Sequence, residues 1–196
     1  MTVNNSVRLF PDRRIAFHTV SDRLCYGSFA ERIETGDYGT CFYRDQIGQL
    51  PEWELHGRPE RTVFVPSRRG GILKRGVQTH AHFGIGNDSS VVVFSAQLAF
   101  HLGFDAVAII GCDLNYEGSK VYAYETDQRD VVHGRNDEIQ KRRHAMHKAN
   151  AEFALLRPVF ERHGRQLINA TSGGNLDALP RLPLAQFLET RTPCSQ

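Results

Sequence analysis

Two short groups of polar residues each come directly after an apolar segment that is typical of a buried strand. The first group follows the segment Ala106–Gly111. The second group begins near the end of the segment Arg165–Ala170 and continues beyond it. Together they supply a carboxylate, amides, hydroxyls and a glycine turn, from Asp113, Asn115, Asn169, Thr171, Ser172 and Gly173. Ligands bind beyond the carboxyl ends of strands in open parallel sheets, so we expect a binding site where these groups meet.

Each group allows a binding role and a structural one. Asp113 could orient a ribose or sugar hydroxyl, because a carboxylate accepts two hydrogen bonds in a fixed geometry. The alternative is an aspartate that bonds the backbone amides of its own loop. The turn after residue 170 could line a nucleotide pocket, or it could only lead the chain into its last helix.

A polar stretch with two tyrosines lies between the two groups, and we predict a lid there, at about residues 115–136. Tyr122 and Tyr124 could donate hydrogen bonds to a departing phosphate and stabilise the charge that develops there. They could instead pack the lid on the core. Near the end of the lid, His144 could act as a general base, since imidazole titrates near neutral pH. Its alternative is a position on a solvated helix face.

A helix is predicted just before the first group. Four apolar side chains recur at helical spacing, at Val91, Phe94, Leu98 and Leu102. Gly103 follows as a left-handed cap would require, and Asp88 or Ser89 could cap the start. The first-turn amides at Ser89 and Ser90 could bind a phosphate or carboxylate through the helix dipole, although capping alone explains the same residues.

The rest of the chain alternates between strand and helix patterns. Strands are predicted at residues 15–20, 39–44 and 61–65, with helices at 21–33 and from 136 or 137 onward. Pro158 is expected to kink or end the second helix, and residues 46–59 read as a polar connection. The alternation implies parallel strands joined by right-handed crossovers. We therefore predict one α/β domain over residues 1–196, Rossmann-like, with a mainly parallel sheet flanked by helices.

Composition fits a globular protein and excludes few partners. The 196 residues carry a net charge of +2 and are 40% hydrophobic, so charge gives no reason to expect nucleic acid. The four cysteines form no C-x-x-C pair, which favours reduced thiols. Residues 1–14 lack the apolar core of a signal peptide and no apolar run is long enough to span a bilayer, so a cytoplasmic location is expected.

Two further features have both a chemical and an ordinary interpretation. His80 and His82 could place two imidazoles on one side of a strand, but no third ligand follows at a persuasive spacing, and no metal site is predicted. The glycine-rich loop 67–86 carries four basic residues, Arg68, Arg69, Lys74 and Arg75. They could bind phosphate or an anionic acceptor, or form a solvated basic loop. This loop or Leu176–Leu188 could also contact a membrane surface.

Three motifs give the chain a resemblance to known proteins: S-V-V-V-F-S-A-Q-L-A-F-H-L-G-F, I-I-G-C-D-L-N-Y-E-G and I-N-A-T-S-G-G-N-L. Over residues 89–188 the chain resembles the bacterial MptE-like (DUF115) family and the related lipopolysaccharide sialyltransferases of glycosyltransferase family 42. The resemblance implies a nucleotide-sugar-dependent transferase that requires no metal. Lid tyrosines there stabilise the leaving phosphate, and a lid histidine serves as base.

The resemblance also suggests roles for individual residues. Tyr122 falls where a lid tyrosine is expected, whereas the other lid tyrosine corresponds to Asn115, with Tyr116 beside it. His144 is preferred as the base over His133 and His147, because its distance to the following helix is close to that of the family.

Three functions remain open at this stage. The first is a sialyltransferase-like enzyme that transfers a sugar from a nucleotide-sugar to a lipopolysaccharide or other surface glycan, without a cofactor. The second is a pterin diphosphokinase that uses ATP and magnesium, with Asp113 and Glu117 on the metal. The third is a non-catalytic nucleotide-binding fragment. No G-N-G-P-S-like loop precedes Ile15, so either an N-terminal nucleotide-binding βα unit is missing or the donor site has changed. A homo-oligomer is expected.

Overall fold

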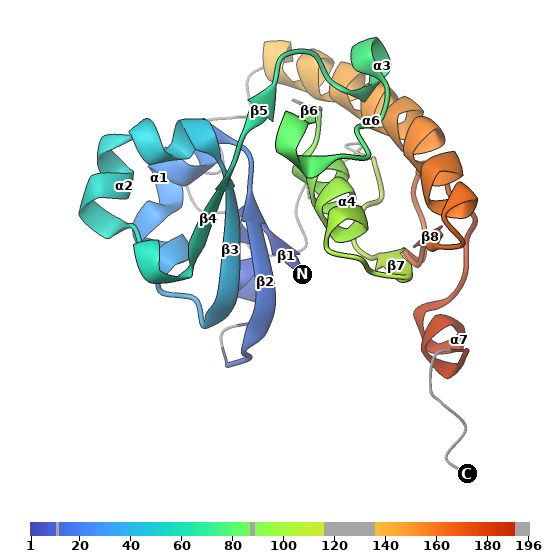
Figure 1. Cartoon of the computed structure of the whole chain (residues 1–196), viewed down its shortest axis with the longest axis horizontal. Coiled ribbons are helices and arrows are strands. Elements are labelled where there is room, and N and C mark those ends of the chain that lie inside the picture. The colour runs from blue at the N-terminus through green and yellow to red at the C-terminus, as the bar shows by residue number, and fades with distance from the viewer. Residues whose placement is uncertain (11, 87–88, 116–135, 191–196) are drawn as a thin grey trace.

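Four parallel strands form the larger sheet of the molecule, in the order β1-β2-β3-β4 (Figure 1). The computed structural model describes residues 1–10, 12–86, 89–115 and 136–190, with the backbone alone at 5, 7, 8, 81 and 136–145. The four strands are β1 (Thr2–Val3), β2 (Ile15–Val20), β3 (Tyr38–Arg44) and β4 (Thr62–Val65). The parallel pairing confirms the prediction, although β1 was not expected.

Helices on one side of this sheet connect its strands. Helix α1 (Arg23–Glu34) joins β2 to β3, and the Asp22 side chain caps its first turn by accepting from the amides of Leu24 and Cys25. The connection from β3 to β4 contains η2 (Asp45–Gln49), α2 (Pro51–His56) and η3 (Pro59–Arg61). The sequence predicted this segment as a polar connection but did not predict its short helices, because they carry too few turns to show a periodic pattern.

The second half of the chain builds a separate two-stranded sheet. Strand β7 (Ala106–Ile109) pairs in parallel with β8 (Gln166–Asn169). Between the two halves, β5 (Ser67–Arg68) pairs with β6 (Ile85–Gly86) across a crossover that holds α3 (Ile72–Arg75) and η4 (Ala81–Phe83). The described strands thus form three parallel sheets, and the prediction of one main sheet holds only for the first four strands.

Helix α4 (Val91–His101) lies between the larger sheet and α6 (Asn136–Arg162) (Figure 1). Its residues 93–100 are all buried, because one face packs on β2, β3 and β6 and the other on α6 and β8. A helix covered on all sides is apolar all round rather than striped. The Ser90 hydroxyl caps the helix by accepting from the Val92 amide, so the expectation of Asp88 or Ser89 as the cap was wrong.

Helix α6 continues through Pro158 for another turn, to Arg162. Proline removes one hydrogen bond of the helix ladder, which costs about 3 kcal/mol in an isolated helix. Here Leu156, Val159 and Phe160 are buried on the two sides of Pro158 and hold the last turn against the core. Tertiary packing outweighs the local preference, so of the two expected outcomes at Pro158, a kink or an end, the end of the helix was wrong.

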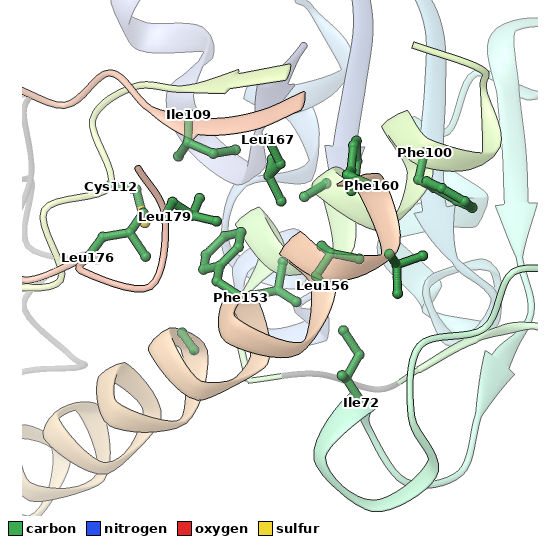
Figure 2. Close-up of a cluster of buried hydrophobic side chains, with 14 residues drawn as sticks. Ile72, Phe100, Ile109, Cys112, Phe153, Leu156, Phe160, Leu167, Leu176 and Leu179 are labelled. Carbon is green, nitrogen blue, oxygen red and sulfur yellow. The ribbon is translucent and has the colours of Figure 1, made fainter. Parts of the chain in front are cut away.

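The core of the second half lies among α3, α4, α6, β7, β8 and the segment after β8. Figure 2 shows Phe153, Leu156 and Phe160 of α6 pointing toward Ile109 and Leu167 of the small sheet. The segment after β8 closes this core with Leu176 and Leu179, which lie beside Cys112 (Figure 2). Buried side chains therefore anchor the loops at the ends of β7 and β8 to the core.

Candidate functional site

The register of β7 and β8 brings the two predicted polar groups together. Ile109 lies opposite Asn169 at the carboxyl ends of the two strands. Beyond this pair, the Ala170 amide donates to the Ile109 carbonyl at 2.8 Å, and the Cys112 amide donates to Thr171 Oγ1 at 3.2 Å. Hydrogen bonds thus join the loop after β7 to the loop after β8, directly beyond the paired strand ends.

Asp113 contacts the second loop through its backbone. Its carbonyl accepts from the Asn175 amide at 2.6 Å. Gly174 has a φ of +78°, and a Cβ there would lie 2.0 Å from the Asp113 carbonyl oxygen. Only glycine fits this position, both for its backbone conformation and for the close approach.

The Asp113 carboxylate points away from the core and is exposed. Its Oδ1 accepts from the Asn115 amide at 3.2 Å, which closes a turn within its own loop. The next residue, Leu114, has a φ of +49°, in the left-handed region that a leucine seldom occupies. The loop therefore holds a strained conformation that keeps the carboxylate at the surface, with Oδ2 bonded to no described residue.

Asn169 is fully buried at the end of β8 and organises the turn that follows. Its Oδ1 accepts from the Thr171 amide at 2.9 Å, and its Nδ2 donates to the Leu176 carbonyl at 2.9 Å. Both ends of the amide side chain are therefore engaged within the protein. Asn169 acts here by positioning its neighbours rather than by facing solvent.

Arg181 holds the glycine turn from the side and was not predicted from the sequence. Its Nη1 donates to the carbonyls of Thr171 and Gly173, at 3.2 and 2.8 Å, and its Nη2 donates to the Gly174 carbonyl at 2.6 Å. Residues 172–174 are exposed, and their amides have no partner among the residues that the structure describes. The turn thus holds three of its carbonyls against Arg181 and has three consecutive N–H groups without a described partner, an arrangement that suits an anion.

Ser89 and Ser90 are both engaged at the start of α4. Glu152 of α6 is fully buried, and its carboxylate accepts from the Ser89 amide at 3.1 Å and from the Ser89 hydroxyl at 2.5 Å. The Ser90 hydroxyl accepts from Val92. The Glu152 carboxylate thus occupies the start of α4, where the helix dipole would otherwise favour a ligand anion.

Several predicted site residues cannot be compared with the structure. Tyr116, Tyr122 and Tyr124 lie outside the described residues, as does almost all of the expected lid. His144 falls on the backbone of α6, and its side chain also lies outside the description.

Cys112 lies in the first loop but has the properties of a core residue. Its side chain is buried against Leu176 and Leu179. Burial raises the pKa of the Cys112 thiol to about 12, and the nearby Asp113 carboxylate adds to the rise. A thiol that stays protonated at neutral pH is a poor nucleophile, so Cys112 contributes packing.

A surface cavity of about 430 Å³ lies apart from these loops, between α1 and α2. Its lining includes Gly27, Arg32, Glu52 and His56. A Cβ at Gly27 would lie 3.6 Å from Glu52 Oε1, which is an ordinary contact distance. No sequence motif predicted this cavity, and it is a second location, beside the β7–β8 loops, at which binding can be measured.

Neither a metal site nor a membrane span is found in the part of the chain that the structure describes. No cluster of three or more His, Cys, Asp or Glu side chains there is arranged to hold a metal ion. No described helix combines the length and the apolar character needed to cross a bilayer. Comparisons with family models, curated proteins and solved structures found no match to this chain.

Proposed function

We propose that this chain is a nucleotide-sugar-dependent glycosyltransferase of the sialyltransferase-like kind, with a Rossmann-like fold and its donor site at the β7–β8 loops. The observation that carries the proposal is the junction of the two loops, in which Gly174 approaches Asp113 and each loop bonds the other. Carboxyl ends of neighbouring parallel strands are the usual position of nucleotide sites in α/β proteins.

The two loops offer complementary chemistry to a nucleotide-sugar. The exposed amides at 172–174 suit a phosphate, because each N–H can donate to a phosphate oxygen. The Asp113 carboxylate retains accepting capacity and suits a ribose or sugar hydroxyl. Asn115, which follows at the same edge, is the third candidate for contact with the donor.

The proposed reaction is direct displacement at the sugar. A base removes the proton of the acceptor hydroxyl, its oxygen attacks the anomeric carbon, and the bond to the nucleotide phosphate breaks. The resemblance assigns the base to His144 and stabilisation of the departing phosphate to Tyr122, and both roles stay predictions. Turnover that survives both Tyr122→Phe and His144→Ala would show that these assignments are wrong.

A thermal-shift screen of the full chain against CMP, UDP, GDP and ATP, with and without magnesium, tests the proposal. A ligand that binds only the folded protein adds about 2.7 kcal/mol at about one hundred times its Kd. For a chain of this size that raises the Tm by about 5 °C or more. A shift with CMP or another nucleotide in the absence of metal supports the proposal.

Two other outcomes would point to different functions. A shift with ATP that requires magnesium would favour the pterin diphosphokinase alternative and contradict transfer from a nucleotide-sugar. Absence of a shift with every nucleotide at millimolar concentration would contradict a transferase of either kind.

A further inference from the structure

A basic segment without acidic residues connects the two halves of the chain. Residues 61–87 contain five arginine and lysine residues and no aspartate or glutamate, although the whole chain has 24 basic and 22 acidic residues. Its cations are Arg61, which pairs with Glu34, and four in the β5–β6 crossover: Arg68, Arg69, Lys74 and Arg75. The crossover is therefore a local concentration of positive charge in a nearly balanced protein.

One buried side chain, Ile72, and one partly buried side chain, Val77, hold the crossover against the core. Ile72 is 1% exposed and lies in the core beside α6 (Figure 2), and Val77 packs on the same cluster. The residues between them face solvent, including Leu73, which is 42% exposed. At Gly70, which has a φ of +81°, the ideal Cβ position is 3.3 Å from Cγ of Arg75, so the loop folds back onto α3.

A second apolar side chain is exposed where the crossover returns toward β6. Phe83 is 60% exposed, although a phenylalanine is ordinarily among the more buried residues. Its ring lies 3.9 Å from that of His82 and 6.4 Å from that of His80, measured between centroids. Phe83 and Leu73 thus add apolar area to a segment whose remaining exposed side chains are mainly basic or polar.

The four cations of the crossover have no acidic partner within the described residues. Among the described residues, the ion pairs involve Arg61, Arg157 and Arg181, and none involves a residue of the crossover. An anionic lipid surface suits both kinds of exposed side chain. Its headgroups can neutralise the basic side chains, and its interface can accept the apolar ones. A nucleic acid would use the charges but gives no comparable role to Leu73.

We propose that the β5–β6 crossover docks on an anionic lipid bilayer through the exposed side chains of Arg69, Leu73, Lys74, Arg75 and Phe83. The proposal does not depend on the transfer reaction at the β7–β8 loops. If both hold, docking would bring the transferase to the surface where lipid-linked acceptors are found.

Co-sedimentation of the full chain with phosphatidylcholine vesicles, with and without phosphatidylserine, tests the proposal. We expect binding only with phosphatidylserine, weakened by salt. The triple variant Arg69→Gln, Lys74→Gln and Arg75→Gln should bind about 100-fold more weakly, at about fivefold for each charge lost. The pair Leu73→Ser and Phe83→Ser should bind about tenfold more weakly, because apolar area no longer enters the interface.

Matched controls come from residues 13–24. Arg13→Gln, Arg14→Gln and Arg23→Gln remove three exposed charges, and Leu24→Ser removes a side chain that is 69% exposed. These variants should keep wild-type binding. Equal losses in the control and crossover variants, or no binding to phosphatidylserine vesicles, would overturn the proposal. So would tight binding of duplex DNA that falls in the charge variant and not in the apolar one.

Discussion

The two halves of the molecule both bury polar side chains, but they differ in the polar groups that stay exposed at the ends of their strands. In the N-terminal half polar side chains lie inside the core, where the buried Glu34 accepts from the hydroxyls of Tyr26 and Tyr43, at 3.0 and 2.9 Å, and from Arg61 at 3.0 Å. The C-terminal half also buries Glu152 and Asn169, but there exposed polar groups gather at the ends of β7 and β8. Interior networks specify packing, whereas exposed groups on a rigid edge are available to a ligand.

The carboxyl ends of the strands show the same contrast. At the end of β3, Arg44 is buried, donates to the carbonyls of Ile85 and Gly86, and stacks on Phe94 at 4.1 Å. Asp45 beside it accepts from the amide and hydroxyl of Ser67. The protein itself therefore occupies this edge of the larger sheet. At the β7–β8 edge, the Asp113 carboxylate and the 172–174 amides retain hydrogen-bonding capacity.

The largest expected effect is on the buried network. Glu34→Ala removes one partner of a buried ion pair and leaves Arg61 without its carboxylate, which should lower the free energy of unfolding by about 4 kcal/mol. Asp113→Asn, at an exposed carboxylate, should leave stability nearly unchanged and weaken nucleotide binding. Urea unfolding and calorimetric titration of both variants measure the contrast. Similar stability losses in the two variants would contradict the distinction between the halves.

A smaller loss is expected where the two polar loops meet. Gly174→Ala introduces a side chain at positive φ and against the Asp113 backbone, and should destabilise the protein by about 3 kcal/mol. Gly173→Ala is the matched control, since its φ is not positive and a Cβ there meets nothing within 4 Å. Melting temperatures that fall equally in the two variants would show that the close approach is not a constraint.

Acid should weaken the N-terminal half through His18. Burial, with a contribution from the Arg61 charge, lowers the pKa of His18 to about 3 from an unfolded value of 6.5. The folded state therefore favours neutral His18. The contribution of neutral His18 to stability is complete above pH 6.5, and it is lost as the pH falls toward 3, because the unfolded chain is protonated first. Between pH 7 and pH 5 we expect a loss of about 2 kcal/mol.

The variant His18→Phe isolates this contribution. It keeps an aromatic ring beside Tyr38, on which His18 stacks at 4.2 Å, and removes the titrating group. Urea unfolding at pH 7 and pH 5 should show a smaller pH dependence for the variant than for the wild type. Identical pH dependence would mean that His18 is not desolvated in the folded protein.

A still smaller loss of stability than at Gly174 or His18 is expected at Arg181. Its guanidinium is 38% exposed, so Arg181→Ala should cost about 1 kcal/mol through lost hydrogen bonds to the turn. Nucleotide binding should fall more, because the carbonyls of Thr171, Gly173 and Gly174 lose the group that orients them. Arg181→Lys cannot donate in the same forked geometry and should recover only part of the affinity. Unchanged affinity in Arg181→Ala would remove the turn from the proposed site.

Local patterns predicted the elements that carry the site. Helical spacing from Val91 to Leu102 predicted α4, and the run from Ala106 predicted β7, because both signals lie within a short window. Gly103 has the expected positive φ after the helix. The pairing of β7 with β8 followed from the rule that alternating strands and helices form parallel sheets.

Contacts between distant residues could not be predicted. Glu152 occupies the start of α4 from 63 positions away, and no local pattern marks an internal carboxylate as the partner of Ser89. Arg181 acts on the turn only because the chain returns beside β8, where the Leu182 amide donates to the Asn169 carbonyl. The separation into three sheets likewise depends on pairings between strands, which the residues of a single strand do not determine.

Amide NMR spectra of the ¹⁵N-labelled chain, recorded during titration with CMP, test the central claim most directly. We expect saturable shifts at Ser172, Gly173, Gly174 and Asn115, with little change at Gly27 and Ser28, which line the cavity between α1 and α2. Shifts confined to that cavity, or no shifts at the ends of β7 and β8, would contradict the account.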